Sequence, residues 1–143
     1  MFIFDSDHLS IVQRQGPAAE YRNLANRLAA YSARYFFVTI VSFHEQVNGW
    51  TAYVARARST VGLVRGYYEF EGILSDFVRA QVLPFSAAAA DIYDDLRRSR
   101  LRVGPMDLRI ASIAIANQMT LLTRNTVDFQ RVPDLPFEDW TRS

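Results

Sequence analysis

The sequence predicts an α/β protein in which helices cover both faces of a parallel β-sheet. Short apolar or β-branched runs alternate along the chain with longer amphipathic segments, which is the pattern of βαβ units. The first run, Phe2-Ile3-Phe4, is apolar on both faces, as expected for a strand inside a parallel sheet. The 143 residues, 50% of them hydrophobic, suffice to build one core, so we expect a single domain over residues 1–143.

The expected strands are short, and turn or capping residues separate them from the helices. After residues 2–4, strands are predicted over Tyr35–Thr39, Gln81–Phe85 and Thr120–Thr123, with a weak last strand at most after Val132. Aromatic and β-branched residues favour the second of these strands, and Pro84 helps to end the third.

Helices are predicted where apolar residues recur at helical spacing. The predicted segments are a helix opening at Pro17, a long region from Phe43 through Val61, a stripe from Tyr67 to Phe77, a helix capped by Ser86, the segment Met106–Asn117 and one turn over Asn125–Phe129. Ser42 is the expected cap of the long region. We expect Gly62 and Gly66 to break it.

The composition excludes several kinds of chemistry. There is no cysteine, and all 16 basic residues are arginine. Disulfide scaffolds, thiolate metal sites and cysteine nucleophiles are therefore excluded, as are Schiff-base and P-loop lysines. Glycine-rich nucleotide-binding fingerprints are also missing. The formal net charge of +1 excludes a polybasic tail and leaves room for a local basic patch.

The chain start carries no targeting pattern. Its first apolar residues lack a basic flank and meet Asp5 at once, unlike a signal peptide. No apolar run approaches the length of a membrane span. We therefore expect a cytoplasmic protein without membrane contact.

Four acidic residues are expected at one edge of the sheet. In an open parallel sheet, ligands bind beyond the carboxyl ends of the strands. The acids near those ends are Asp5, Glu45, Asp107 and Asp128. Converging carboxylates repel one another and are stable only around a cation. Hard oxygen ligands suit Mg²⁺ or Mn²⁺, and such an ion can activate water and neutralise charge on a phosphodiester.

Each acid also has a structural explanation. The run Ser42-Phe43-His44-Glu45 has the spacing of a capping box. Asp107 is expected in a first helical turn, where the helix dipole favours any acid, and Asp128 follows Asn125, which can act as a cap. Asp5 can cap the next helix, but a carboxylate at the end of an apolar strand is costly unless it is paired or metal-bound.

The arginines supply candidate phosphate contacts. An arginine-rich segment covers residues 97–102, and Arg109 follows it. Guanidinium groups bind phosphate through two parallel hydrogen bonds and stack on bases. We take Arg100, Arg102 and Arg109 as candidate RNA contacts. A solvated helix end, favoured by its dipole, is the alternative explanation.

Four segments spread over nearly the whole chain combine apolar runs with acids. They are Phe2–Ser10, Val41–Glu45, Met106–Ala111 and Leu121–Phe129. In this order and spacing they resemble the PIN-domain family and, more narrowly, the VapC-type toxin ribonucleases. The resemblance implies a three-layer α/β/α sandwich with a central parallel sheet of Rossmann-like topology. It also implies a Mg²⁺- or Mn²⁺-dependent endoribonuclease that forms a homodimer and is inhibited by a cognate antitoxin.

The resemblance assigns a role to each acid. Asp5 and Asp107 match the direct metal ligands, and Glu45 and Asp128 complete the catalytic pocket, in part through metal-bound water. The matching supporting residues are Ser6 and Asn125.

Two positions depart from the family pattern without removing an acid. Asp7 stands where the family has Asn or Asp, so it either adds a fifth carboxylate or caps a helix. Pro105 stands directly before the third motif and is expected to stiffen that loop.

Two other functions stay open. Asp5-Ser6-Asp7 after an apolar strand also resembles the nucleophile loop of haloacid-dehalogenase-like phosphatases, but their chemistry needs a cation that is normally lysine. The domain can also be a catalytically silent binding or assembly module. We expect His8 at the surface or the site rim, His44 to pack on its helix, and aromatic side chains such as Tyr67 to lie in a core or a dimer interface.

Overall fold

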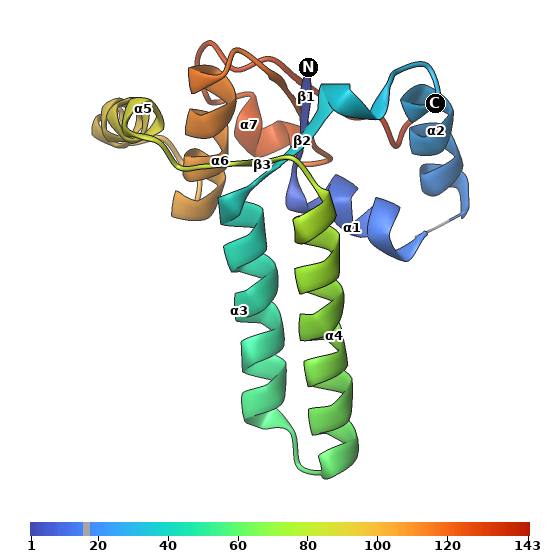
Figure 1. Cartoon of the computed structure of the whole chain (residues 1–143). Helices are drawn as coiled ribbons and strands as arrows, with labels where there is room; N and C mark the ends of the chain where they lie inside the picture. Colours follow the sequence, from blue (N-terminus) through green and yellow to red (C-terminus); the bar gives the residue numbers. More distant parts are fainter. Residues whose placement is uncertain (16–17) are drawn as a thin grey trace.

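A five-stranded parallel sheet forms the centre of the protein (Figure 1). The structure is a computed structural model that describes residues 1–15 and 18–143. The strand order is β3-β2-β1-β4-β5, and each neighbouring pair is parallel. The strands are β1 (Phe2–Phe4), β2 (Phe36–Thr39), β3 (Val82–Leu83), β4 (Thr120–Leu122) and β5 (Phe137–Glu138). The predicted α/β class and parallel sheet are confirmed.

Helices connect these strands. They are α1 (Ser6–Arg14), α2 (Ala18–Leu28), α3 (Ile40–Arg56), α4 (Thr60–Arg79), α5 (Ala87–Arg98), α6 (Pro105–Ala116) and α7 (Thr126–Phe129), with a 3-10 turn over Ala33–Tyr35. Apolar spacing does not predict α1, which begins directly after Asp5 caps it. The predicted cap of α5 is confirmed, because Ser86 Oγ accepts from the Ala89 N–H at 3.2 Å. The helix start predicted at Pro17 lies outside the described residues.

Apolar side chains cover the sheet on both faces. Ile3 and Leu121 belong to a core shared with α5, α6 and α7. Phe4 and Leu122 belong to a second core shared with α1, α2 and α4. Because neighbouring residues of a strand point to opposite faces, strands buried on both faces must be apolar throughout. The result is the three-layer α/β/α sandwich that the resemblance implied.

The long helical region starts earlier and breaks earlier than predicted. Thr39 caps α3, since its hydroxyl accepts from the Ser42 N–H at 3.1 Å, so the expectation that Ser42 is the cap is wrong. Between α3 and α4 the chain leaves helical geometry before Ser59, which caps α4. Gly62 and Gly66 lie inside α4, so the predicted break at these glycines is also wrong.

Helices α3 and α4 pack side by side as a hairpin that projects away from the sheet (Figure 1). Gly66 is buried where the two helices meet, and a Cβ atom on it would lie 2.4 Å from Val54 Cγ2. This glycine therefore permits a close approach of the helices. Tyr67 is 58% exposed, so a position in the core of this chain is wrong for it, and the dimer interface stays a prediction. None of the described helices has both the length and the apolar character needed to cross a membrane.

Replacing Gly66 with alanine should destabilise the hairpin. The new methyl group must displace Val54, and such overpacking costs ~1–3 kcal/mol, more than the ~1 kcal/mol that alanine gains in a helix. Gly72→Ala is the matched control, because open space surrounds that position in the same helix. We expect urea unfolding to show lower stability for Gly66→Ala and unchanged or higher stability for Gly72→Ala. Equal stability of the two variants would contradict the packing role.

Candidate active site

The chain reverses its course across the sheet between β1 and β4. It passes outward from β1 to β2 and β3, then returns to β4 on the other side of β1. Ligands of open α/β sheets bind beside such a reversal, at the carboxyl ends of the strands. Asp5 follows β1 there, and its N–H donates to the Leu122 carbonyl of β4 at 2.9 Å. The topology thus places Asp5 at the point where a site is expected.

Asp5 is 5% exposed, and hydrogen bonds hold both of its oxygens. Oδ1 accepts from the Ser6 N–H at 2.8 Å, and Oδ2 accepts from the Thr123 hydroxyl at 2.8 Å. Burial raises the pKa of Asp5 to about 7, helped by the charges of Asp7 and Asp107 and opposed by the two hydrogen bonds. Asp5 therefore caps α1 and also faces the other acids, so the two explanations of this residue are compatible.

Glu45 reaches the same site from α3. Its Oε1 accepts from the Ser6 hydroxyl at 2.9 Å, and Ser6 also binds Asp5 through its backbone. The capping-box explanation of Glu45 is wrong, because Thr39 rather than Ser42 caps this helix. Ser6 links the two acids, because its backbone N–H binds Asp5 and its hydroxyl binds Glu45.

Asp107 and Asp128 complete the group. Asp107 lies in the first turn of α6, and burial raises its pKa to about 6, with further contributions from Glu45, Asp128 and Asp7. Asp128 Oδ2 accepts from Asn125 Nδ2 at 3.0 Å, and its Oδ1 pairs with Arg131 at 3.1 Å. Asp107 contributes to the raised pKa of Asp5, and Glu45 and Asp128 contribute to that of Asp107, so the four predicted acids lie within range of one another's charge.

This donor set fits a hard divalent cation in its chemistry. Partly or fully buried carboxylates that raise one another's pKa are stabilised by a positive ion between them. Within residues 1–15 and 18–143, no three acidic or histidine side chains are arranged to surround one ion. Mg²⁺ commonly binds through one or two carboxylates and keeps several waters, so such an ion would take Asp5 and Asp107 as ligands and water for the rest of its shell.

The predicted RNA contacts lie outside this acidic group. Arg100 and Arg109 line a separate pocket to which none of the four acids contributes. Arg102 is exposed, and its carbonyl oxygen accepts from Arg131 Nη1 at 2.9 Å. The cation that the described structure places against the acids is Arg131, paired with Asp128.

No sequence pattern indicated the role of Thr123, and both histidines were misplaced. His8 is fully buried, so its predicted surface position is wrong. Its Nε2 accepts from the Trp140 N–H at 3.1 Å, which leaves the proton on Nδ1, 3.0 Å from Asp7 Oδ1. His44 is exposed and contacts Asn48 at 3.1 Å, so the prediction that it packs is wrong as well.

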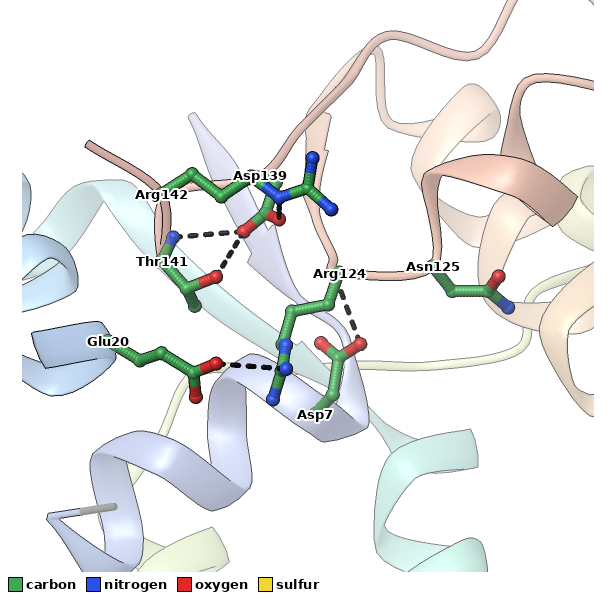
Figure 2. Close-up of a pocket in the computed structure, with 7 residues that line it drawn as sticks. All are labelled: Asp7, Glu20, Arg124, Asn125, Asp139, Thr141 and Arg142. Atoms are coloured by element: carbon green, nitrogen blue, oxygen red, sulfur yellow. Dashed lines mark hydrogen bonds and ion pairs between the residues drawn. The ribbon is translucent and has the colours of Figure 1, made fainter. Parts of the chain in front are cut away.

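Asp7 is held by hydrogen bonds from two parts of the chain. It accepts hydrogen bonds from the backbone and ring of His8 and from the Arg124 N–H, the last at 3.0 Å. Figure 2 shows Asp7 beside Arg124, whose guanidinium pairs with Glu20 at 2.9 Å. Asp7, Glu20 and Arg124 line a cavity of about 550 Å³. The ion pair of Arg142 with Asp139 lies in the same cavity. Arg124 and Arg142 are both paired with carboxylates. These contacts hold the loop after β4 in place and leave neither guanidinium unpaired for a ligand.

The fold is that of VapC-type PIN domains. VapBC-1 from nontypeable Haemophilus influenzae superposes with a TM-score of 0.75 at 20% identity, over 99% of this chain and 98% of that chain. VapBC2 from Rickettsia felis bound to a DNA fragment from its promoter gives 0.72 at 24% identity, over 97% and 98%. At these identities the likeness establishes the fold.

Sequence similarity points to the same proteins. Ribonuclease VapC2 of Rickettsia felis is 40% identical over 68 residues, 45% of this chain and 51% of that protein. The tRNA(fMet)-specific endonuclease VapC of Shigella flexneri is 40% identical over 75 residues, 50% of this chain and 54% of that protein. The chain thus spans about half the length of the curated relatives it matches. No family model matches it. The predicted resemblance to VapC-type ribonucleases is confirmed.

Replacing His8 should destabilise the protein far more than replacing His44. His8→Gln leaves the Trp140 N–H or Asp7 without its buried partner, at a cost of ~1–3 kcal/mol. His44→Gln is the matched control, because that ring is exposed, and its effect should stay within ~0.5 kcal/mol. Urea unfolding of both variants measures the difference. Equal effects would contradict the buried link between α1 and the C-terminal segment.

The stability of the metal-free protein should fall as pH rises. The folded pKa of Asp5 is about 7, above its ordinary value of 3.8. Its contribution is therefore fully present below about pH 4 and is lost as pH rises through about 7. In EDTA, Asp5→Asn should remove part of this loss, because the amide has the same shape and the Thr123 hydroxyl can accept as well as donate.

Thermal unfolding between about pH 4 and about pH 8 tests this sign. Asp91→Asn, a change at an exposed acid of α5, is the control and should follow the unmodified chain. Stability of the unmodified chain that does not change with pH in EDTA would contradict the raised pKa.

Proposed function

We propose that this protein is a Mg²⁺- or Mn²⁺-dependent endoribonuclease and the toxin of a toxin–antitoxin pair. The observation that carries the proposal is the acidic group at the sheet reversal, where burial and neighbouring carboxylates raise the pKa of both Asp5 and Asp107. Similarity to proteins named ribonuclease VapC2 and tRNA(fMet)-specific endonuclease VapC supports RNA as the substrate.

Each acid has a distinct task in this proposal. Asp5, fixed by the Thr123 hydroxyl, and Asp107 would hold the ion. When bound, a divalent ion offsets charge on the phosphodiester and lowers the pKa of a bound water. Glu45, oriented by Ser6, would accept a proton from attacking water in this proposal. Asp128 is oriented in the same way by Asn125.

Two alternatives remain as outcomes of the test. A catalytically silent binding module would keep the fold without the activity. An aspartyl-phosphate phosphatase would need Asp7 as its second acid and a cation that is normally lysine, and this sequence contains no lysine. Phosphatase activity lost in both Asp5→Asn and Asp7→Asn would favour the phosphatase.

We also propose two protein contacts in the cytoplasm, one with a cognate antitoxin and one with a second copy. Solved structures of similar fold include one named as a toxin–antitoxin complex, from Klebsiella pneumoniae. The α4 helix exposes several large apolar side chains, namely Val61, Val64, Tyr67, Tyr68, Leu74 and Val78. Exposed apolar patches of this kind mark protein interaction sites.

RNA cleavage should depend on the ion and on Asp5 and Asp107. We expect cleavage of structured RNAs with Mg²⁺ or Mn²⁺, none with EDTA, and a loss of roughly 100-fold or more in Asp5→Asn and Asp107→Asn. Each substitution keeps the shape of the side chain and removes one charge.

The control variant is Asp91→Asn, which removes a charge from the exposed face of α5 and should leave cleavage unchanged. Calorimetric titration with Mn²⁺ follows the same variants. Absence of cleavage together with absence of metal binding would overturn the proposal and favour the silent module.

A further inference from the structure

A second charged pocket lies between the end of α5 and the first half of α6. Its volume is about 450 Å³, and its lining includes Tyr93, Arg97, Arg100, Leu101, Pro105 and Arg109. Among the described residues that line it, none is acidic. The three guanidinium groups make no ion pair with a carboxylate in the described part of the chain. This concentration of unpaired positive charge contrasts with the cavity of Figure 2, where both arginines are paired.

The tyrosine ring holds two of these arginines in place. The guanidinium carbons of Arg97 and Arg109 each lie 5.5 Å from the centre of the Tyr93 ring. Cation–π contacts of this length restrict flexible side chains. Two cations held around one ring repel each other, and an anion bound between them would relieve that repulsion.

The turn after α5 brings a third arginine back to the pocket. The Arg100 N–H donates to the Arg97 carbonyl at 3.1 Å, and Arg100 has a left-handed φ of 53°. Glycine or asparagine usually occupies this position after a helix, and another residue costs ~1 kcal/mol there. The side chain of Arg100 is exposed, and it lines the pocket from this turn.

The pocket is joined to the acidic site through Arg131. This guanidinium bonds Asp128 Oδ1 at 3.1 Å and the Arg102 carbonyl at 2.9 Å, so it connects the acids with the turn that carries Arg100. On α6, Asp107 and Arg109 are two residues apart and thus lie on opposite sides of the helix. The same first turns of α6 therefore border both sites.

We propose that this arginine pocket binds a phosphodiester of the RNA strand outside the acidic site at which the strand is cut. The inference rests on the proposed ribonuclease function. Guanidinium groups bind phosphate through paired, charge-assisted hydrogen bonds. An RNA strand that runs from the acidic site past Arg131 would reach the positive charge of the arginine pocket. In this proposal the pocket aligns the RNA, and the acids carry out the cleavage.

Binding is measured apart from cleavage in an Asp5→Asn background with EDTA. The probe is a mixed-sequence single-stranded RNA, followed by fluorescence anisotropy over a range of NaCl concentrations. Arg97→Gln/Arg109→Gln should weaken binding about tenfold and reduce the slope of log K against log[NaCl] by roughly 0.7 for each phosphate that the variant no longer binds. Arg100→Gln should change the slope in the same direction.

The matched control is Arg56→Gln/Arg58→Gln. It removes the same two charges from exposed positions at the far end of the α3–α4 hairpin. We expect it to leave affinity and slope within about twofold, since exposed charges beyond a Debye length are screened. An equal loss of affinity in both pairs would overturn the pocket and favour diffuse attraction.

Cleavage separates this inference from the proposed function. In the chain with intact acids, the pocket variants should raise KM and leave kcat within about twofold, because they remove binding energy that the ground and transition states share. If the unmodified chain cuts RNA and the pocket variants match the control, the pocket inference alone fails. If the unmodified chain neither binds nor cuts RNA, the proposed function fails. A change in molecular mass of the variants in light scattering would make the pocket a subunit contact and overturn the inference.

Discussion

The burial of one carboxylate determines the arrangement of the site. Asp5 ends β1, the middle strand of the sheet, and is nearly inaccessible to water. A charged group at this depth must be hydrogen-bonded, paired or protonated. Ser6 and Thr123 provide the hydrogen bonds, but the surrounding acids raise the pKa further. The ionised form of Asp5 is therefore destabilised at the end of β1, and a cation bound beside it would stabilise that form.

Three consecutive residues after β4 connect this carboxylate with the rest of the site. Thr123 binds Asp5, the Arg124 N–H binds Asp7, and Asn125 binds Asp128. Asp7 is also hydrogen-bonded to the buried ring of His8, and that ring accepts a hydrogen bond from Trp140 in the C-terminal segment. The position of the acids thus depends on the sheet and also on a distant part of the chain, which explains why a loop can carry an ordered site.

The sequence predicted what local patterns determine. Apolar strands followed by acids indicated β1 with Asp5 and β4 with Asp128, because strand ends in a parallel sheet meet at one edge. It missed what depends on distant partners. Thr39 and Ser42 are both good caps, and the path of β2 decides between them. The burial of His8 follows from its contact with Trp140, 132 positions away. Gly66 is needed because Val54 of α3 lies against it, and the residues around Gly66 do not indicate that contact.

The separation of acids and arginines along α6 explains how one short helix can serve two purposes. A guanidinium beside a carboxylate lowers its pKa and takes the place that a metal ion would need. Burial and the charges of Glu45 and Asp128 raise the pKa of Asp107. The Arg109 guanidinium lies over the Tyr93 ring instead. Arg131 is the exception, but it pairs with Asp128 at the outer edge of the group, where both side chains are more than a third exposed. Positive charge therefore lies beside Asp5 and Asp107 without pairing with them, which is the distribution that the proposed RNA strand and divalent ion would require together.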